Sequence, residues 1–318
     1  MHRWLIPLTV AVLLLAAQPV SAARFQQGVV ENFADLATAS CHNPEGITAD
    51  AAGTLYAAGL SGNICVVNGD GEVTRVITVA AGHALLGEIF VNGQIYVADN
   101  NGDFSGARVT RVNVATGAVT VVAEGFANTN AFERDGNGTL YVSDSFRGAV
   151  YTVNPTTGAT ALWKQDELLR SHGFPGFGAN GLAFDATRSN LYVANTGDDR
   201  IFRIPLNPNG TAGELALFAD GATINASHHT TGALNGADGI VFDASGRLWV
   251  CANQANEIQV LAPSGTNLVK RFSGSGDNAM HFPASPVFVG HAMFVANLYF
   301  GTPGAGKISV LGAAPGAP

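Results

Sequence analysis

Four polar residues occupy the same place in a repeated sequence motif, and each of their side chains can offer an oxygen atom to a cation. They are Glu45, Asn130, Asn180 and Asp238. Two carboxylates and two carboxamides, with no thiolate or imidazole in the set, suit a hard cation. We therefore expect one divalent cation as cofactor, Ca²⁺ first, with Mg²⁺ or Mn²⁺ as alternatives.

The motif predicts a strand, a tight turn and a second strand. After the polar residue come an apolar strand, an Asp-x-x-Gly turn and a Leu-Tyr or Leu-Trp pair, with one residue inserted before Leu191 in the Asn180 copy. Asp at the first and Gly at the last position of a four-residue turn suit a type I connection. Because Asn-Gly and Asp-Gly are common turn dipeptides, any one polar position could be conformational only. Glu45, and Asn130 followed by Ala131, are not explained in that way.

Two weaker copies, Ile89 to Val97 and Val287 to Val295, bring the number of repeats to six. An aromatic residue of the second strand recurs every 40 to 57 residues, at Tyr56, Tyr96, Tyr141, Tyr192, Trp249 and Phe294. This period, with four short strands in each repeat, is typical of a propeller blade. The last repeat lacks one strand, which Val29 to Phe33 can supply. We predict an all-β, six-bladed β-propeller over residues 23–318, with the ring closed by an N-terminal strand.

The N-terminus predicts export. Arg3 precedes an apolar run from Leu5 to Ala17, and the small residues Val20, Ser21 and Ala22 follow, as in a secretory signal peptide over residues 1–22. The run is too short to span a membrane. We expect a secreted or periplasmic protein without a membrane anchor after cleavage.

Charge and cysteine content narrow the partners further. Without Arg3, 15 basic residues face 24 acidic ones and no run of Lys or Arg occurs, so nucleic acid is not expected as a partner. An oxidising compartment permits disulfides. Cys41 and Cys65 lie at the two ends of the first repeat and could be bridged, or all three cysteines could simply be packed as small apolar residues.

Six histidines lie in segments that lead into first strands, which would place them on the face of the tetrad: His42, His83, His172, His228, His229 and His281. Each could be a solvated loop residue. His83 and His281 are the better candidates for a catalytic base because their loops are short. The long segments 164–178 and 220–237 should wall the pocket, where Phe174 and Phe177 could contact an acyl chain or anchor the loop. We add His172 and His229 as candidate substrate-binding residues.

The tetrad, together with the sequences PEGI, ANGLAFD and GADGIVFDASGRLWVCAN, resembles the senescence marker protein (regucalcin) and gluconolactonase family. The resemblance implies a catalytic divalent cation at Glu45, Asn130, Asn180 and Asp238, and hydrolysis of a lactone or related ester. It also implies that Asp238 acts as a base or nucleophile. Asn128, two residues before Asn130, is a candidate substrate-binding residue; sugar-lactone enzymes carry an Arg there, so this difference speaks against specificity for gluconolactone.

Two other classes of protein remain open. A non-catalytic propeller of the NHL type would use its loops to bind a protein or a glycan. A strictosidine synthase-like lyase shares the architecture. The tetrad favours the hydrolase, because a binding module has no need of four oxygen ligands around its axis.

Overall fold

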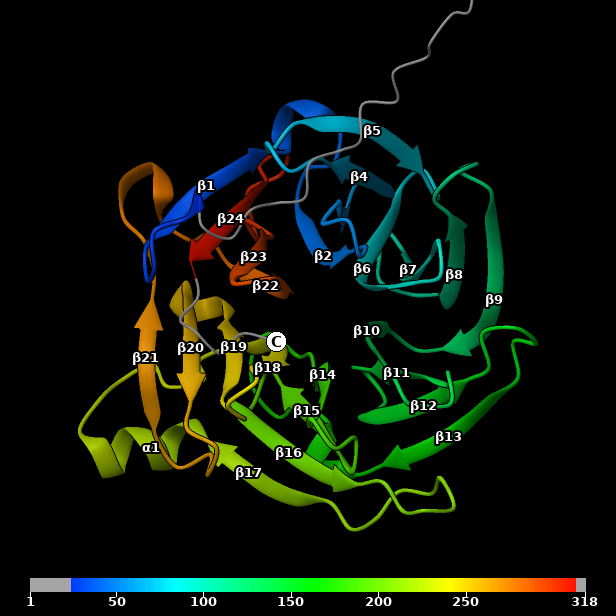
Figure 1. Cartoon of the computed structure of the whole chain (residues 1–318). Helices are drawn as coiled ribbons and strands as arrows, with labels where there is room; N and C mark the ends of the chain where they lie inside the picture. Colours follow the sequence, from blue (N-terminus) through cyan, green and yellow to red (C-terminus); the bar gives the residue numbers. More distant parts are fainter. Residues whose placement is uncertain (1–23, 313–318) are drawn as a thin grey trace, which may run out of the picture.

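The computed structural model describes residues 24–312, which form six four-stranded antiparallel sheets around a central axis (Figure 1). The predicted signal peptide lies outside the described residues. Within residues 24–312, no helix is both long and apolar enough to cross a bilayer. The prediction of a six-bladed β-propeller is confirmed.

Each blade runs outward from the axis as four consecutive strands. Blade 1 contains β2 (Pro44–Ala49), β3 (Leu55–Gly59), β4 (Asn63–Val67) and β5 (Val73–Thr78). Blade 2 contains β6 (His83–Val91), β7 (Gln94–Asn101), β8 (Ala107–Asn113) and β9 (Val119–Phe126). Blade 3 contains β10 (Thr129–Arg134), β11 (Leu140–Asp144), β12 (Ala149–Val153) and β13 (Thr160–Gln165).

The second half repeats this plan. Blade 4 contains β14 (Ala179–Phe184), β15 (Asn190–Asn195), β16 (Arg200–Pro205) and β17 (Ala216–Asp220). Blade 5 contains β18 (Ala237–Phe242), β19 (Leu248–Ala252), β20 (Glu257–Leu261) and β21 (Leu268–Phe272). Blade 6 contains β22 (Pro283–Val289), β23 (Ala292–Asn297), β24 (Lys307–Gly312) and β1 (Val30–Asp35).

The ring is closed by β1, as predicted. This strand pairs antiparallel with β24, with Val30 opposite Leu311 and Asp35 opposite Lys307. Figure 1 shows β1, in blue, beside β24, in red. Because the outer edge of blade 6 is supplied from the other end of the chain, the two ends of the ring are joined by a ladder of backbone hydrogen bonds.

The Asp-x-x-Gly turns form the expected hairpins. In blade 1, Oδ1 of Asp50 accepts hydrogen bonds from the backbone N–H groups of Ala52 and Thr54, and Gly53 takes a left-handed φ of 84°. Asp135 makes the same contacts in blade 3 and Asp243 in blade 5. The aspartate therefore holds the turn through its side chain while the glycine supplies the conformation that other residues avoid.

The recurring aromatic residues pack each blade against the next. Tyr56 stacks on Phe90 of blade 2, and Trp249 meets Phe288 of blade 6 edge to face. Equivalent edge-to-face pairs join Tyr141 to Phe184 and Tyr192 to Phe242. The period that identifies the blades in the sequence is thus the period of the contacts between them.

The glycines that follow the polar motif residues serve packing around the axis and not a turn. Gly181 and Gly239 lie inside strands β14 and β18. A Cβ atom on Gly181 would lie 2.2 Å from the carbonyl oxygen of Asp238, and one on Gly239 would lie 2.4 Å from that of Ala284. Gly46 is confined in the same way by Leu86. The turn interpretation of these dipeptides is therefore wrong.

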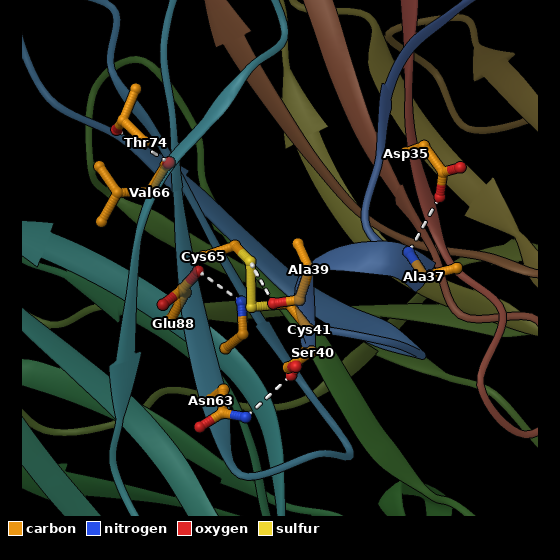
Figure 2. The surroundings of a disulfide bond; sticks show 11 residues. Asp35, Ala37, Ala39, Ser40, Cys41, Asn63, Cys65, Val66, Thr74 and Glu88 are labelled. Carbon is orange, nitrogen blue, oxygen red and sulfur yellow. Dashed lines mark hydrogen bonds between the residues drawn. A yellow bond between two sulfur atoms is a disulfide. The ribbon is translucent and has the colours of Figure 1, made fainter.

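A disulfide joins Cys41 to Cys65 in blade 1, with Cα atoms 5.9 Å apart (Figure 2). Figure 2 also shows Asn63, whose side chain donates a 2.8 Å hydrogen bond to the carbonyl oxygen of Ser40. The disulfide thus ties the segment that leads into β2 to the edge of β4. Cys251 is free and buried.

The two long connections differ in structure. Segment 164–178 contains a 3₁₀ turn, Glu167–Leu169, and reaches the central cavity through Pro175 and Phe177. Segment 220–237 forms helix α1 (Gly221–His228), whose Ile224 is buried at the periphery of the ring (Figure 1). None of the described cavity-lining residues comes from α1. The expectation that both segments wall the pocket is therefore correct for the first only.

Candidate metal-binding site and pocket

Strand register places the four polar motif residues at one level near the axis. In four blades, the first-strand residue that pairs with the second-strand aromatic comes three positions after the motif residue. These first-strand residues are Thr48, Glu133, Ala183 and Val241. In blades 2 and 6 the aromatic residue pairs with Ile89 and Val287. The positions three residues earlier, which correspond to the motif residues, are Leu86 and Ala284. The ring at this level therefore has four polar and two apolar members.

Glu45, Asn130, Asn180 and Asp238 line one cavity of about 40 Å³, together with the polar residues Thr196 and Asn253. All four tetrad side chains are buried. No group of three or more His, Cys, Asp or Glu side chains suited to a metal occurs within residues 24–312. A metal at the axis would therefore rely on the amides of Asn130 and Asn180 as well as on the two carboxylates.

Residues at or just after the ends of three second strands fix the backbone just before three tetrad members. The Asn100 amide donates to the carbonyl oxygen of Thr129 at 2.9 Å, and the Ser145 hydroxyl donates to that of Ala179 at 2.7 Å. The Thr196 hydroxyl donates to the carbonyl oxygen of Ala237 at 2.8 Å. Blades 2, 3 and 4 thereby each position the tetrad residue of the following blade.

Two of the tetrad side chains are also oriented by a neighbour. Nδ2 of Asn180 donates to the hydroxyl of Thr196 at 2.8 Å, which leaves Oδ1 on the opposite end of the amide. Nδ2 of Asn253 donates to Oδ2 of Asp238 at 2.8 Å. Such partners fix the direction in which a ligand oxygen points.

Ionisation of both tetrad carboxyls is unfavourable in the buried site. Burial, followed by the charges of Asp238 and Glu88, raises the pKa of Glu45 well above its usual value. Burial raises the pKa of Asp238 to about 7, although hydrogen bonds from Asn253 and Asn180 oppose the rise. A cation between them would favour both ionised forms.

The residues present fit a divalent cation. Oε2 of Glu45 is buried and has no hydrogen-bond partner, which is unusual for a carboxylate oxygen. The four side chains supply only oxygen donors, and two formal charges balance those of the ion. The unpartnered oxygen and the paired buried carboxyls are both accounted for if a cation lies among them.

The proposed histidine bases lie away from the cavity wall. Nδ1 of His83 is 2.7 Å from Oδ1 of the buried Asp99, whose Oδ2 accepts from Arg108 at 2.8 Å. The His281 ring stacks on Tyr299 at 4.5 Å, and burial together with the charge of Lys307 lowers its pKa. Neither is among the described lining residues, and their catalytic roles stay predictions.

The remaining histidines are spread over both faces. His172 is exposed, and its hydrogen bond to Asp198 raises its pKa. His229 is exposed at the C-terminal end of α1. His228 approaches the carbonyl oxygen of Thr266, in the β20–β21 turn. That turn lies at the opposite end of the strands from the tetrad, so the placement of His228 on the tetrad face is wrong.

Of the other candidate substrate contacts, one lines the cavity. Phe177 does so, whereas Phe174 is 70% exposed and its carbonyl oxygen accepts a hydrogen bond from Gln254. Asn128 is fully buried, and its amide donates to Oδ1 of Asn100 at 3.3 Å. Contact of Phe174 and Asn128 with a substrate stays a prediction.

Several lining residues lie outside the sequence-based prediction. Thr196 and Asn253 follow strands β15 and β19, where the common ending Val-Ala-Asn or Cys-Ala-Asn gave a usable signal. The remaining apolar residues, Leu60, Leu86, Phe104, Phe282, Leu298 and Phe300, occur in loops or strands without such a pattern.

Comparison with known families now bears on the site. Residues 175–299 match the family described as the SMP-30/gluconolactonase/LRE-like region. The matched stretch covers less than half of the 318 residues. It contains Asn180 and Asp238, and the resemblance read from the sequence motifs is confirmed at this level. Residues 33–67, which contain Glu45, match the N-terminal part of the strictosidine synthase-like family.

Several solved structures share the fold of this chain. A regucalcin from Agrobacterium tumefaciens, described as a calcium-binding protein, is 20% identical, with a TM-score of 0.63 over 85% of this chain and 90% of that one. A gluconolactonase from Xanthomonas campestris is 18% identical, with a TM-score of 0.63 over 85% and 86%. A luciferin-regenerating enzyme is 14% identical, with a TM-score of 0.65 over 91% and 98%. Among curated proteins, none matches the sequence.

Proposed function

We propose that this protein is an exported, metal-dependent hydrolase of lactones or related esters. The observation that carries the proposal is the cavity in which Glu45, Asn130, Asn180 and Asp238 meet, with Oε2 of Glu45 buried and unpartnered. These four side chains would hold one divalent cation, most simply Ca²⁺. When bound, such an ion polarises a carbonyl and lowers the pKa of a coordinated water molecule.

The chain's own residues have distinct tasks in this proposal. Asp238 is the candidate proton acceptor, because it lines the cavity and one of its oxygens is held by Asn253. Thr196 holds Asn180 in place, and the apolar residues around the cavity limit the access of water. His83 and His281 remain candidates for proton transfer only if loop movement brings them closer.

Elemental analysis of the purified protein tests the metal, and a panel of lactones and aryl esters tests the reaction. We expect about one divalent cation per chain, with loss of both metal and turnover in Glu45→Gln and Asp238→Asn. Glu124→Gln removes an exposed carboxylate on β9 and should retain both. Wild-type protein without stoichiometric metal, or unchanged metal content in both tetrad variants, would overturn the proposal.

The same measurements separate the alternatives. The resemblance of residues 33–67 to strictosidine synthase-like proteins favours a lyase as second candidate. Wild-type protein with neither stoichiometric metal nor turnover of any panel member would be compatible with that class. Stoichiometric metal without turnover of any panel member would favour a non-catalytic propeller that binds a protein or a glycan through its loops.

A further inference from the structure

The cavity has a polar floor and apolar walls. Its floor consists of the tetrad with Thr196 and Asn253. Every other lining residue is apolar, and four of them are phenylalanines: Leu60, Leu86, Phe104, Pro175, Phe177, Phe282, Leu298 and Phe300. A ligand that enters the cavity therefore meets hydrogen-bonding side chains only at the bottom.

The phenylalanines form two separate aromatic walls. Phe177, from the loop before blade 4, lies 5.9 Å from Phe104 of blade 2 and 5.3 Å from Phe146 of blade 3. Phe282 and Phe300, both of blade 6, are stacked with ring centroids 5.2 Å apart. Because blades 3 and 6 stand opposite each other in a six-bladed ring, the walls face the cavity from opposite sides (Figure 1).

The backbone is strained where it presents these rings. Phe104 has a φ of 63° and Phe282 a φ of 55°, in the left-handed region that bulky residues rarely adopt. Phe300 remains 50% exposed to solvent. Stability of the fold alone would favour glycine in place of Phe104 and Phe282, and a polar residue in place of Phe300. The rings therefore have a use that stability does not explain.

We propose that the site takes lactones or esters whose carbonyl reaches the polar floor and whose apolar acyl or aryl body lies between the two aromatic walls. This inference rests on the proposed hydrolase function. A sugar lactone would bring several hydroxyl groups against walls without hydrogen-bonding side chains, which is unfavourable. An alkyl chain loses only water at the same surfaces.

Binding of a non-hydrolysable series tests the inference without reference to turnover. In 2-alkyltetrahydrofurans the lactone carbonyl is absent and the tail can be lengthened one methylene at a time. Titration calorimetry should show affinity rising about twofold to fourfold per methylene until the tail extends past the aromatic walls into solvent. Affinity that does not change with tail length would overturn the inference.

Turnover of γ-lactones with tails of increasing length, set beside gluconolactone, then separates the two proposals. Hydrolysis that favours gluconolactone over long-tailed γ-lactones would overturn the inference but leave a lactonase. Tail-dependent binding without hydrolysis of any lactone would overturn the hydrolase and leave the apolar site. Rising kcat/KM with tail length supports both.

Variants of the walls identify the residues responsible. Phe282→Gly and Phe104→Gly should lower affinity for the longest-tailed ether at least fivefold while leaving the melting temperature unchanged or higher, because the left-handed backbone is relieved. Asn92→Gly relieves a φ of 50° in the β6–β7 turn and should leave affinity unchanged. Phe300→Ser, at a half-exposed site, provides a variant that should fold in any case. Full affinity in all three phenylalanine variants would contradict the role of the walls.

Discussion

Thr196 accepts a 2.8 Å hydrogen bond from the side-chain amide of Asn180 and donates a 2.8 Å bond to the carbonyl oxygen of Ala237. A single hydroxyl thus orients a tetrad residue of blade 4 and fixes the backbone just before Asp238 of blade 5. Asn100 and Ser145 fix the backbone before Asn130 and Asn180 in the same manner. Three of the four tetrad residues are therefore positioned by contacts that pass from one blade to the next.

Thr196→Val keeps the shape of this side chain and removes its hydroxyl. We expect about tenfold weaker metal affinity with little change in fold, because Asn180 loses the partner that orients its amide. Competition with a chelator measures the affinity. Thr152→Val, on the outer strand β12, makes the same chemical change away from the axis and should leave affinity unchanged. Equal affinities in Thr196→Val and wild type would contradict this positioning role.

Gly181→Ala tests the close approach of blades 4 and 5. Its Cβ atom would lie 2.2 Å from the carbonyl oxygen of Asp238, so the blades must separate, at a cost of about 1–3 kcal/mol in the free energy of unfolding. Chemical denaturation measures this cost, and metal affinity should fall with it. Gly136→Ala is the control, because no heavy atom lies within 4 Å of its added Cβ. Wild-type stability in both Gly181→Ala and Gly136→Ala would contradict the close packing of blades 4 and 5.

The fold could be predicted because its signals repeat. Tyr56, Tyr141 and Trp249 recur at the blade period, since each packs on a neighbouring blade. Glu45 and Asp238 were expected to meet because they occupy the same position of the repeated motif. The first strands pair in the same register in blades 1 and 5, so this position lies at the same level of the ring in both. Sequence periodicity was thus sufficient wherever the structure itself is periodic.

The other parts of the candidate site could not be predicted, because they depend on structural features that do not repeat from blade to blade. Phe282 and Phe300 reach the cavity from irregular loops, and the left-handed backbone of Phe282 has no sequence signature. His83, expected in a short loop, is the first residue of β6, and its ring is engaged by Asp99 and Arg108, which are distant in sequence. From the sequence, the glycines after Glu45, Asn180 and Asp238 could serve either a turn or close packing between blades. Only the short distances between neighbouring blades in the structure decide for packing.

The ionisation of the buried Glu88 carboxyl should make the stability of the fold depend on pH. Burial raises the pKa of this carboxyl from 4.5 to about 8, partly offset by the hydrogen bond from the backbone N–H of Ala58. Because the raised pKa belongs to the folded state, the contribution of Glu88 to stability is full below pH 4.5 and is lost as pH rises through about 8. Glu88→Gln should therefore be more stable than wild type at pH 9, by at least about 2 °C in melting temperature, with the advantage shrinking toward pH 5.

The change with pH of the difference in melting temperature between Glu88→Gln and wild type is the decisive readout; loss of the Glu88 charge also eases the ionisation of Glu45, which acts in the same direction. Glu124→Gln should show no such pH-dependent difference from wild type, since this carboxyl is exposed. A melting-temperature difference between Glu88→Gln and wild type that stays constant from pH 5 to pH 9 would count against a buried carboxyl that takes up its proton near pH 8.

The bridge between Cys41 and Cys65 should stabilise blade 1. It closes a loop with a sequence separation of 24, for which loop-closure entropy gives about 3 kcal/mol. The double variant Cys41→Ser with Cys65→Ser should lose about this much in the free energy of unfolding and should no longer respond to a reductant. Cys251→Ala, which leaves the bridge intact, should respond to the reductant as wild type does. Equal stability of oxidised and reduced wild type would show that the bridge contributes little to the free energy of unfolding.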